Sequence, residues 1–138
     1  REKNIDIQKH FISDLPEIHA YVGELNQVWT NLIDNAIFAM EKNGTLTIRT
    51  SRDTKNVLVS VKDSGSGIEP EIISRIFDPF FTTKKVGEGN GIGLDIVSRI
   101  IKKHNGTITV QSRPGCTEFS ICLPIVQPAP LTENEQVN

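Results

Sequence analysis

The sequence predicts a two-layer α/β sandwich, in which helices cover one face of a mostly antiparallel sheet. Five segments alternate apolar and polar residues, as half-buried strands do. Two longer segments repeat apolar residues with the period of an amphipathic helix. Four of the five strands come as hairpins, which favours antiparallel pairing. The 138 residues are enough for one domain with a hydrophobic core.

The first half of the chain predicts one strand and one long helix. The segment NIDIQKHFI, residues 4–12, alternates as a strand. Residues 23–42 read as a helix, and we expect Asn43 and Gly44 to close it, since Gly after Asn is typical of a helix C-terminus. The apolar stripe of this helix comprises Leu25, Val28, Trp29, Leu32, Ile33, Ala36, Ile37 and Met40.

The second half predicts two hairpins separated by helices. Strands are expected at 45–51 and 56–63, and again at 107–112 and 117–123. Between the hairpins lie a short helix around 71–77, a Gly-rich loop from Asp78 to about Gly91, and a helix from about Gly93 to His104 capped by Asn105 and Gly106.

Domain organisation follows from composition. Residues 1–125 are expected to form one domain, and residues 126–138, which are polar and contain Pro, a flexible tail or linker. The only methionine is Met40, so Arg1 is not a translation start and we expect the chain to be a piece of a longer protein.

Composition also excludes several classes. The net charge of −2 with scattered cations argues against a nucleic-acid partner. No run approaches the roughly 20 apolar residues that span a bilayer, so no membrane contact is expected of this domain. Without a signal-peptide pattern we expect a cytoplasmic location, leaving open a membrane anchor elsewhere in the full-length protein. Cys116 and Cys122 form no CxxC and are expected to be reduced thiols.

Four motifs could carry chemistry. In GEGNGIGLD, residues 87–95, Gly91 and Gly93 stand where a helix begins, and backbone N–H groups there favour phosphate. The usual phosphate motifs GxxxxGK[ST] and GxGxxG are absent, so simple loop flexibility is the alternative. Asp63 ends a strand before Gly65 and Gly67, and its carboxylate can accept a hydrogen bond from an exocyclic amine; an Asx turn is the alternative.

The other two motifs lie in the first helix and after Asp78. Asn31 and Asn35 are four residues apart at the edge of the apolar stripe, and their amide oxygens suit Mg²⁺. Ordinary polar boundary residues are the alternative. In DPFFTTKK, residues 78–85, the two phenylalanines are either a core anchor or part of a site, and Lys84 and Lys85 are either solvated or phosphate contacts.

The order of these motifs resembles one family. NLIDNA is similar to the N box, DSGSGI to the first glycine box, FDPFFTTK to the F box and GNGIGL to the second glycine box of the catalytic ATP-binding domain of sensor histidine kinases. This domain has the Bergerat fold of the gyrase, heat-shock chaperone, kinase and MutL superfamily. The resemblance runs from about Asp6 to Pro124, includes the last hairpin GCTEFSICLP, and is greatest for the nitrogen-regulation-type branch.

The resemblance implies a site for ATP and Mg²⁺. Asp63 would take the adenine amino group, helped by Thr117, while Gly65 and Gly67 let the base approach. Asn35 would coordinate Mg²⁺, with Asn31 beside it as the second catalytic position, and the glycine loop would be the hinge of a lid over the triphosphate. The implied ATP-binding set is Asn31, Asn35, Asp63, Gly65, Gly67, Ile68, Phe81, Thr83, Lys84, Gly89, Gly91, Gly93, Leu94 and Thr117.

The implied reaction is transfer of the γ-phosphate to a histidine on a separate dimerisation and phosphoacceptor domain, and then to a cognate response regulator. None of His10, His19 and His104 is followed by an acidic residue, so all three are expected to be surface or strand residues and the acceptor lies outside this chain. The chain alone is expected to be a monomer with negligible turnover. Phe38 stands where many members carry Lys or Arg, which predicts modest nucleotide affinity.

Three rival functions stay open. A hydrolytic relative such as gyrase or MutL carries a glutamate where this chain has Asn31, and an amide cannot take a proton from water. An anti-sigma-factor-type serine kinase has the same fold, and the FFTTK segment disfavours it. An ATP-gated protein-interaction module would bind nucleotide without phosphotransfer.

Overall fold

The structure is a computed structural model that describes residues 3–79 and 93–125. Within these residues the elements follow the predicted order of strands and helices. They are β1 (Asn4–His10), α1 (Val22–Ala39), β2 (Asn43–Arg52), β3 (Asn56–Asp63), α2 (Pro70–Ile73), α3 (Gly93–Lys103), β4 (Thr107–Arg113) and β5 (Cys116–Pro124).

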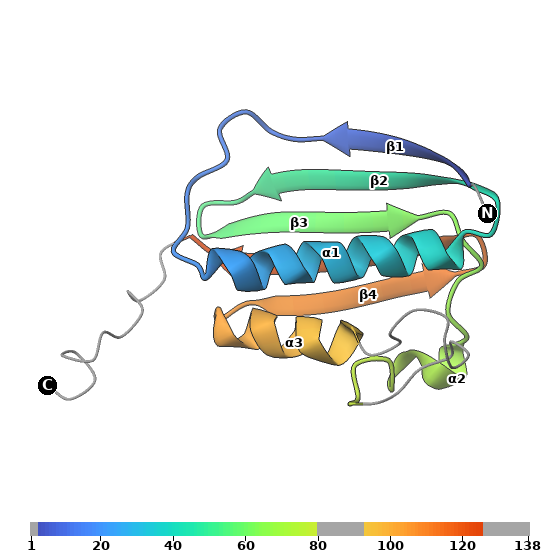
Figure 1. Cartoon of the computed structure of the whole chain (residues 1–138). Coiled ribbons are helices and arrows are strands. Elements are labelled where there is room, and N and C mark those ends of the chain that lie inside the picture. The colour runs from blue at the N-terminus through green and yellow to red at the C-terminus, as the bar shows by residue number, and fades with distance from the viewer. Residues whose placement is uncertain (1–2, 80–92, 126–138) are drawn as a thin grey trace, which may run out of the picture.

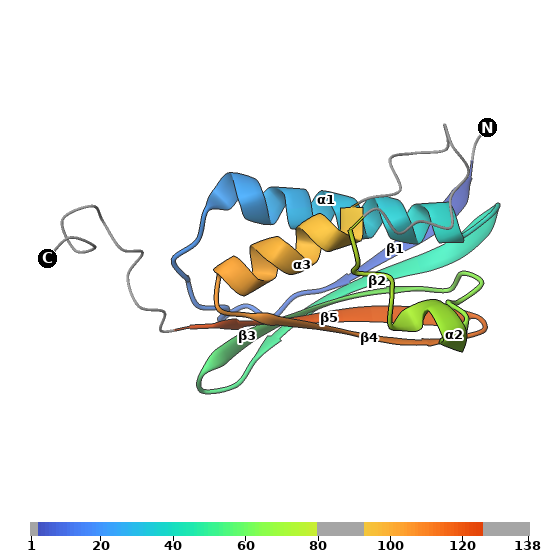
Figure 2. The ribbon, with the colours of Figure 1, turned by 90° about the horizontal axis from the view of Figure 1, so that it is seen from below.

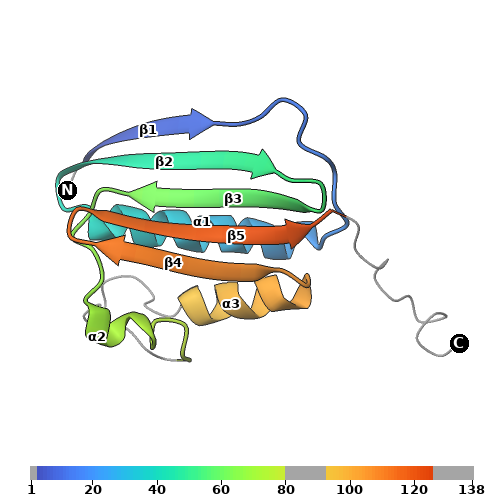
Figure 3. The same cartoon turned by 180° about the vertical axis from the view of Figure 1, so that it is seen from behind.

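The strands form one sheet in the order β1-β2-β3-β5-β4, seen from behind in Figure 3. β1 runs parallel to β2, and every other neighbouring pair is antiparallel. Helix α1 links the two parallel strands by crossing over the sheet, as a parallel connection requires (Figure 1). Figure 2 shows α1 and α3 together on one face of the sheet. The predicted two-layer sandwich is therefore confirmed.

The core lies between the helices and the sheet, because each element turns its apolar side inward. Along β5 the side chains alternate strictly: Thr117, Phe119, Ile121 and Leu123 are buried, and the residues between them are less so. Helix α1 buries Leu25, Val28, Leu32 and Ala36, and α3 buries Val97, Ile100 and Ile101. These positions follow the helical period, so the apolar stripes predicted for both helices are the faces that pack on the sheet.

The end of α1 differs from the prediction. The helix stops at Ala39, and Asn43 and Gly44 are the first two residues of β2 rather than a helix cap. Met40 leaves the helix in an extended conformation and is fully buried. A Cβ on Gly44 would collide with the Met40 sulfur, so this glycine makes room for a core side chain. The end of α3 agrees with the prediction, since Asn105 has a φ of +62° and Gly106 N–H donates to the Ile101 carbonyl.

His104 contradicts its prediction. His10 and His19 are exposed, as expected, but His104 keeps only 3% of its surface. Its Nδ1 lies 2.8 Å from the Ile100 carbonyl, and the Tyr21 backbone N–H donates to its Nε2 at 3.0 Å. The ring is therefore neutral, donating at Nδ1 and accepting at Nε2. His104 therefore connects the end of α3 to the start of α1. Its burial could not be predicted from its place among the basic residues of the last helical turn.

Two compositional predictions can be compared with the structure. Cys116 and Cys122 are free thiols on β5. Among the described helices, none has the length and apolar character needed to cross a bilayer.

Candidate functional site

Asp63 is the last residue of β3 and is only 2% exposed. Its Oδ1 accepts the Gly65 backbone N–H at 2.8 Å, so the Asx turn exists. Burial raises the pKa of the Asp63 carboxyl, and the hydrogen bond from Gly65 opposes this shift only in part. No cation lies near it among the described residues to offset the charge. A carboxylate held in this way is a strong acceptor for a donor that a ligand brings.

Thr117 lies directly opposite Asp63 in the β3–β5 ladder and is 4% exposed. Its Oγ1 lies 2.7 Å from the Ser112 Oγ, which also accepts the Ile68 backbone N–H at 2.7 Å. The two strands and the loop after β3 are thus joined by side-chain hydroxyls. Ser112 was not predicted as a site residue. The available signal was a serine at an inward position of β4, where Ile108 and Val110 precede it on the same face.

The two glycines after Asp63 have roles that the sequence did not predict. A Cβ on Gly65 would lie 2.6 Å from the Ala39 carbonyl oxygen, and one on Gly67 would lie 2.5 Å from the Arg113 carbonyl oxygen. Gly67 also has a φ of +90°, a conformation that favours glycine. Both residues are therefore required by contacts with the protein's own backbone. Their predicted contact with a base stays a prediction.

Asn31 and Gly93 bring the two helices together. The Asn31 Nδ2 donates to the Gly93 carbonyl at 3.2 Å, and a Cβ on Gly93 would lie 3.1 Å from the Asn31 amide. Gly93 thus lets the first turn of α3 lie against α1. Because the first turn of a helix has backbone N–H groups without an intrahelical partner and the positive end of the helix dipole, it is suited to an anion.

Asn35 lies one turn beyond Asn31 and is half-buried. Among the described residues its amide has no hydrogen-bond partner. An amide oxygen free in this way fits Mg²⁺, which takes few protein ligands and completes its shell with water and phosphate. The described residues contain no cluster of three or more carboxylate, His or Cys side chains that could hold a metal ion. A metal ion at Asn35 would therefore need phosphate and water as further ligands.

The remaining predicted residues fall into two groups. Ile68 and Leu94 pack their side chains against the core, so any contact with nucleotide comes from their edges or backbone. Phe38, which stands where many members of the family carry Lys or Arg, is 42% exposed on α1, and its predicted effect on affinity stays a prediction. Five predicted residues lie outside the described part of the chain: Phe81, Thr83, Lys84, Gly89 and Gly91.

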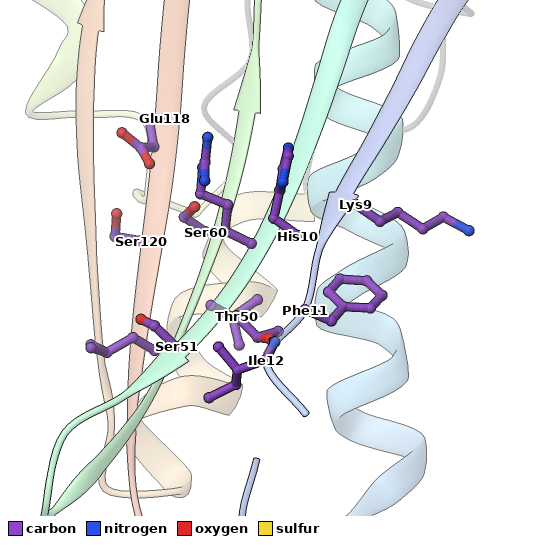
Figure 4. A pocket seen from close by; sticks show the side chains of 12 residues that line it. Lys9, His10, Phe11, Ile12, Thr50, Ser51, Ser60, Glu118 and Ser120 are labelled. Carbon is purple, nitrogen blue, oxygen red and sulfur yellow. The ribbon is translucent and has the colours of Figure 1, made fainter. Parts of the chain in front are cut away.

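A hollow elsewhere on the molecule contains none of the predicted residues. It has a volume of about 720 Å³ and lies against β1, β2, β3 and β5, with Phe11 and Ile12 at one side. Figure 4 shows His10, Ser60, Glu118 and Ser120 among its side chains. Ser60 and Ser120 face each other across the ladder, at positions that alternate with the buried Val61 and Phe119. Their side of the sheet is the one that the helices leave open.

Comparison with known proteins agrees with the geometry. Residues 21–127 match the family described as "Histidine kinase-, DNA gyrase B-, and HSP90-like ATPase". The chain is 36% identical to sporulation kinase E of Bacillus subtilis over 96% of its own length and 18% of that protein. It is 42% identical to the sensor histidine kinase ZraS of Escherichia coli over 87% of its length and 26% of that protein.

Solved structures give the same result. The nucleotide-free catalytic domain of the histidine kinase ThkA superposes with a TM-score of 0.80 at 36% identity, covering 88% of this chain and 80% of that one. ThkA in complex with the response regulator protein TrrA matches with a TM-score of 0.74 at 32% identity, covering 88% of this chain and 34% of that one.

The fold and the family match together define the class of protein: the chain belongs to the histidine kinase-, DNA gyrase B- and HSP90-like ATPase family. Within it, the chain is the ATP-binding catalytic domain of a sensor histidine kinase. It spans about a quarter or less of the curated relatives named above. The nitrogen-regulation-type branch stays a prediction.

Proposed function

We propose that this domain holds Mg·ATP and delivers the γ-phosphate to a histidine on a separate phosphoacceptor domain, from which a response regulator receives it. The observation that carries the proposal is the buried Asp63 carboxylate, which faces Thr117 and lacks a cationic partner among the described residues. It provides an acceptor for an adenine amino group. ThkA, which matches this chain, is known in complex with a response regulator, and this supports the partner.

Each part of the pocket has a separate task in this proposal. Asp63 and Thr117 bind the base, and the start of α3, held by Asn31, receives the phosphates through its backbone N–H groups. Asn35 holds Mg²⁺, which neutralises phosphate charge when bound. Phosphoryl transfer depends mainly on positioning and charge stabilisation, so a domain without its own acceptor histidine can carry the catalytic part. Because ATP is its substrate, we place the domain in the cytoplasm.

The first test is calorimetric titration of Mg·ADP and Mg·AMP-PNP into the chain and two variants. We expect wild type to bind, and Asp63→Asn to lose at least tenfold in affinity because an amide cannot replace the carboxylate as a double acceptor. Glu118→Gln is the matched control, since Glu118 adjoins Thr117 on β5 but occupies an outward position of the alternating strand. No binding by wild type up to millimolar nucleotide would overturn the proposal.

The second test separates a kinase from an interaction module. Radiolabelled ATP is added to the chain together with a phosphoacceptor domain from a histidine kinase of this class. Acid-labile, base-stable label on the acceptor domain supports phosphotransfer. Nucleotide binding that is never followed by label, with several acceptor domains, would favour the ATP-gated interaction module.

A further inference from the structure

Ser112 occupies the middle of a hydrogen-bonded chain that ends at the proposed base pocket. Its Oγ accepts the Ile68 backbone N–H at 2.7 Å, and the same oxygen lies 2.7 Å from the Thr117 Oγ1. The first distance is at the short end of the range for an N–H donor, and the second is typical of a hydrogen bond between hydroxyls. Ser112 thus links the loop after β3 to β5, although neither Ile68 nor Thr117 is its neighbour in sequence.

The direction of this chain follows from charge. The Ile68 N–H can only donate, so Ser112 is an acceptor at that contact and keeps its own hydroxyl hydrogen. Thr117 stands opposite Asp63, with Cβ atoms of such cross-strand pairs about 5 Å apart. If Thr117 donated to Ser112, its lone pairs would be turned to the Asp63 carboxylate. In the favourable arrangement Ser112 donates to Thr117, which leaves the Thr117 hydrogen available to a base bound beside Asp63.

A donor beside an acceptor selects between purines. Adenine presents an amino group, which donates, next to N1, which accepts. Guanine presents O6, which accepts, next to N1–H, which donates. Asp63 as acceptor and Thr117 as donor therefore complement adenine and oppose guanine. A hydroxyl can rotate to accept instead, unless a neighbour holds it in place.

We propose that Ser112 is a positioning residue that fixes the Thr117 hydroxyl as a donor and thereby sets the preference of the pocket for adenine over guanine. This inference rests on the proposed function, since it assigns a role at the same pocket. Ser112 also holds the Ile68 amide, so the loop that follows Asp63 keeps its place against β4.

The test measures competition of Mg·ADP and Mg·GDP against a fluorescent ATP analogue. In Ser112→Ala we expect Mg·ADP to bind about tenfold more weakly, while Mg·GDP binds as well as in wild type or better. Ser112→Thr keeps a hydroxyl and is expected to retain the wild-type preference. Ser120→Ala removes a hydroxyl on the other face of the sheet and is the matched control.

If Ser112 only stabilised the fold, its substitution would not change the relative affinity for Mg·ADP and Mg·GDP. Equal weakening of both nucleotides in Ser112→Ala would overturn the inference, as would a ratio of Mg·ADP to Mg·GDP affinity in that variant equal to the wild-type ratio. An independent measurement without nucleotide is amide hydrogen exchange of Ile68, which should accelerate in Ser112→Ala but not in Ser120→Ala. If wild type binds Mg·ADP and Ser112→Ala behaves identically, only this inference fails. If wild type does not bind, the proposed function fails as well.

Discussion

The carboxyl group of Asp63 is buried in the folded domain without a cation among the described residues to offset it. Because burial raises its folded-state pKa above the value in the unfolded chain, the ionised form destabilises the folded domain at neutral pH. As pH falls through the raised pKa, the carboxyl becomes protonated and this cost disappears. A buried charge that lowers the stability of the folded domain is typical of a ligand-binding residue.

Asp63→Asn is therefore expected to stabilise the nucleotide-free domain at about pH 7, by about 0.5–2 kcal/mol, while it weakens nucleotide binding. The gain should shrink as pH falls through the raised pKa of the folded-state carboxyl, since the wild-type side chain then becomes neutral too. Urea unfolding of both proteins at several pH values measures this. A variant that is less stable at neutral pH, or a gap that widens on acidification, would contradict the prediction.

Alanine substitutions at three glycines can distinguish the stability cost of steric crowding from the cost of a positive φ. Gly67 has both a φ of +90° and a carbonyl 2.5 Å from the position of a Cβ, whereas Gly115 has a φ of +86° in open space. Gly23 lies in the first turn of α1, also in open space. We expect Gly115→Ala to cost about 1–2 kcal/mol and Gly67→Ala clearly more, while Gly23→Ala is neutral or stabilising by up to about 1 kcal/mol. Thermal or urea unfolding gives this order, and equal losses at Gly67 and Gly115 would show that the Arg113 contact is unimportant.

At the scale of elements, α1 and α3 are tied together at two places. Asn31 contacts Gly93 at the start of α3, and His104 accepts the Tyr21 N–H just before α1 begins. An ion pair of Lys103 with Glu24 lies at the second place, where the Lys103 ammonium also sits 4.4 Å from the centre of the Tyr21 ring. These contacts hold α3 alongside α1 at both ends of α3, and they determine where the first turn of α3 meets Asn31.

His104→Ala is expected to lower the free energy of unfolding by about 2–4 kcal/mol, because a buried ring is replaced by a cavity and the Tyr21 N–H loses its acceptor, while the Ile100 carbonyl keeps only the His104 backbone N–H. His104→Asn, which keeps a donor near Nδ1, and His104→Gln, which keeps an acceptor near Nε2, should each lose less. Lys103→Ala, which breaks the exposed ion pair, should cost clearly less than His104→Ala, because solvent screens an exposed pair. Urea unfolding compares the four variants. A His104→Ala loss no greater than that of Lys103→Ala would show that the buried contacts are not essential.

The same elements show how much could be predicted from sequence. Strand and helix order followed from the periods of apolar residues, which the core then confirmed in α1, α3 and β5. Asn43 and Gly44 were misassigned because a helix cap and the start of a strand have the same local signal, and only the packing of Met40 distinguishes them. The burial of His104 and the bridging role of Ser112 depend on partners 83 and 44 residues away in the chain, which no local pattern specifies.

At the scale of the whole molecule, the candidate site is assembled from segments that are distant in sequence. Asp63 and Thr117 meet through strand register, Gly65 meets the end of α1 at Ala39, and Asn31 meets α3 at Gly93. The site therefore depends on the complete two-layer fold. β5 is central to it, because it lies between β3 and β4 and carries Thr117.

The extent of β5 leads to a prediction about the domain boundary. Leu123 is fully buried, and Ile125 N–H donates to the Lys55 carbonyl at 2.8 Å, one residue after the strand ends. A chain ending at Ile125 is thus expected to keep its free energy of unfolding within about 0.5 kcal/mol and its Mg·ADP affinity unchanged. A chain ending at Cys122 should lose several kcal/mol, since removing a buried leucine side chain alone costs about 2–5 kcal/mol. Urea unfolding and calorimetry of the two shortened chains measure both quantities. If the chain ending at Ile125 lost stability as the shorter one does, residues beyond 125 would belong to the domain and the predicted boundary would be wrong.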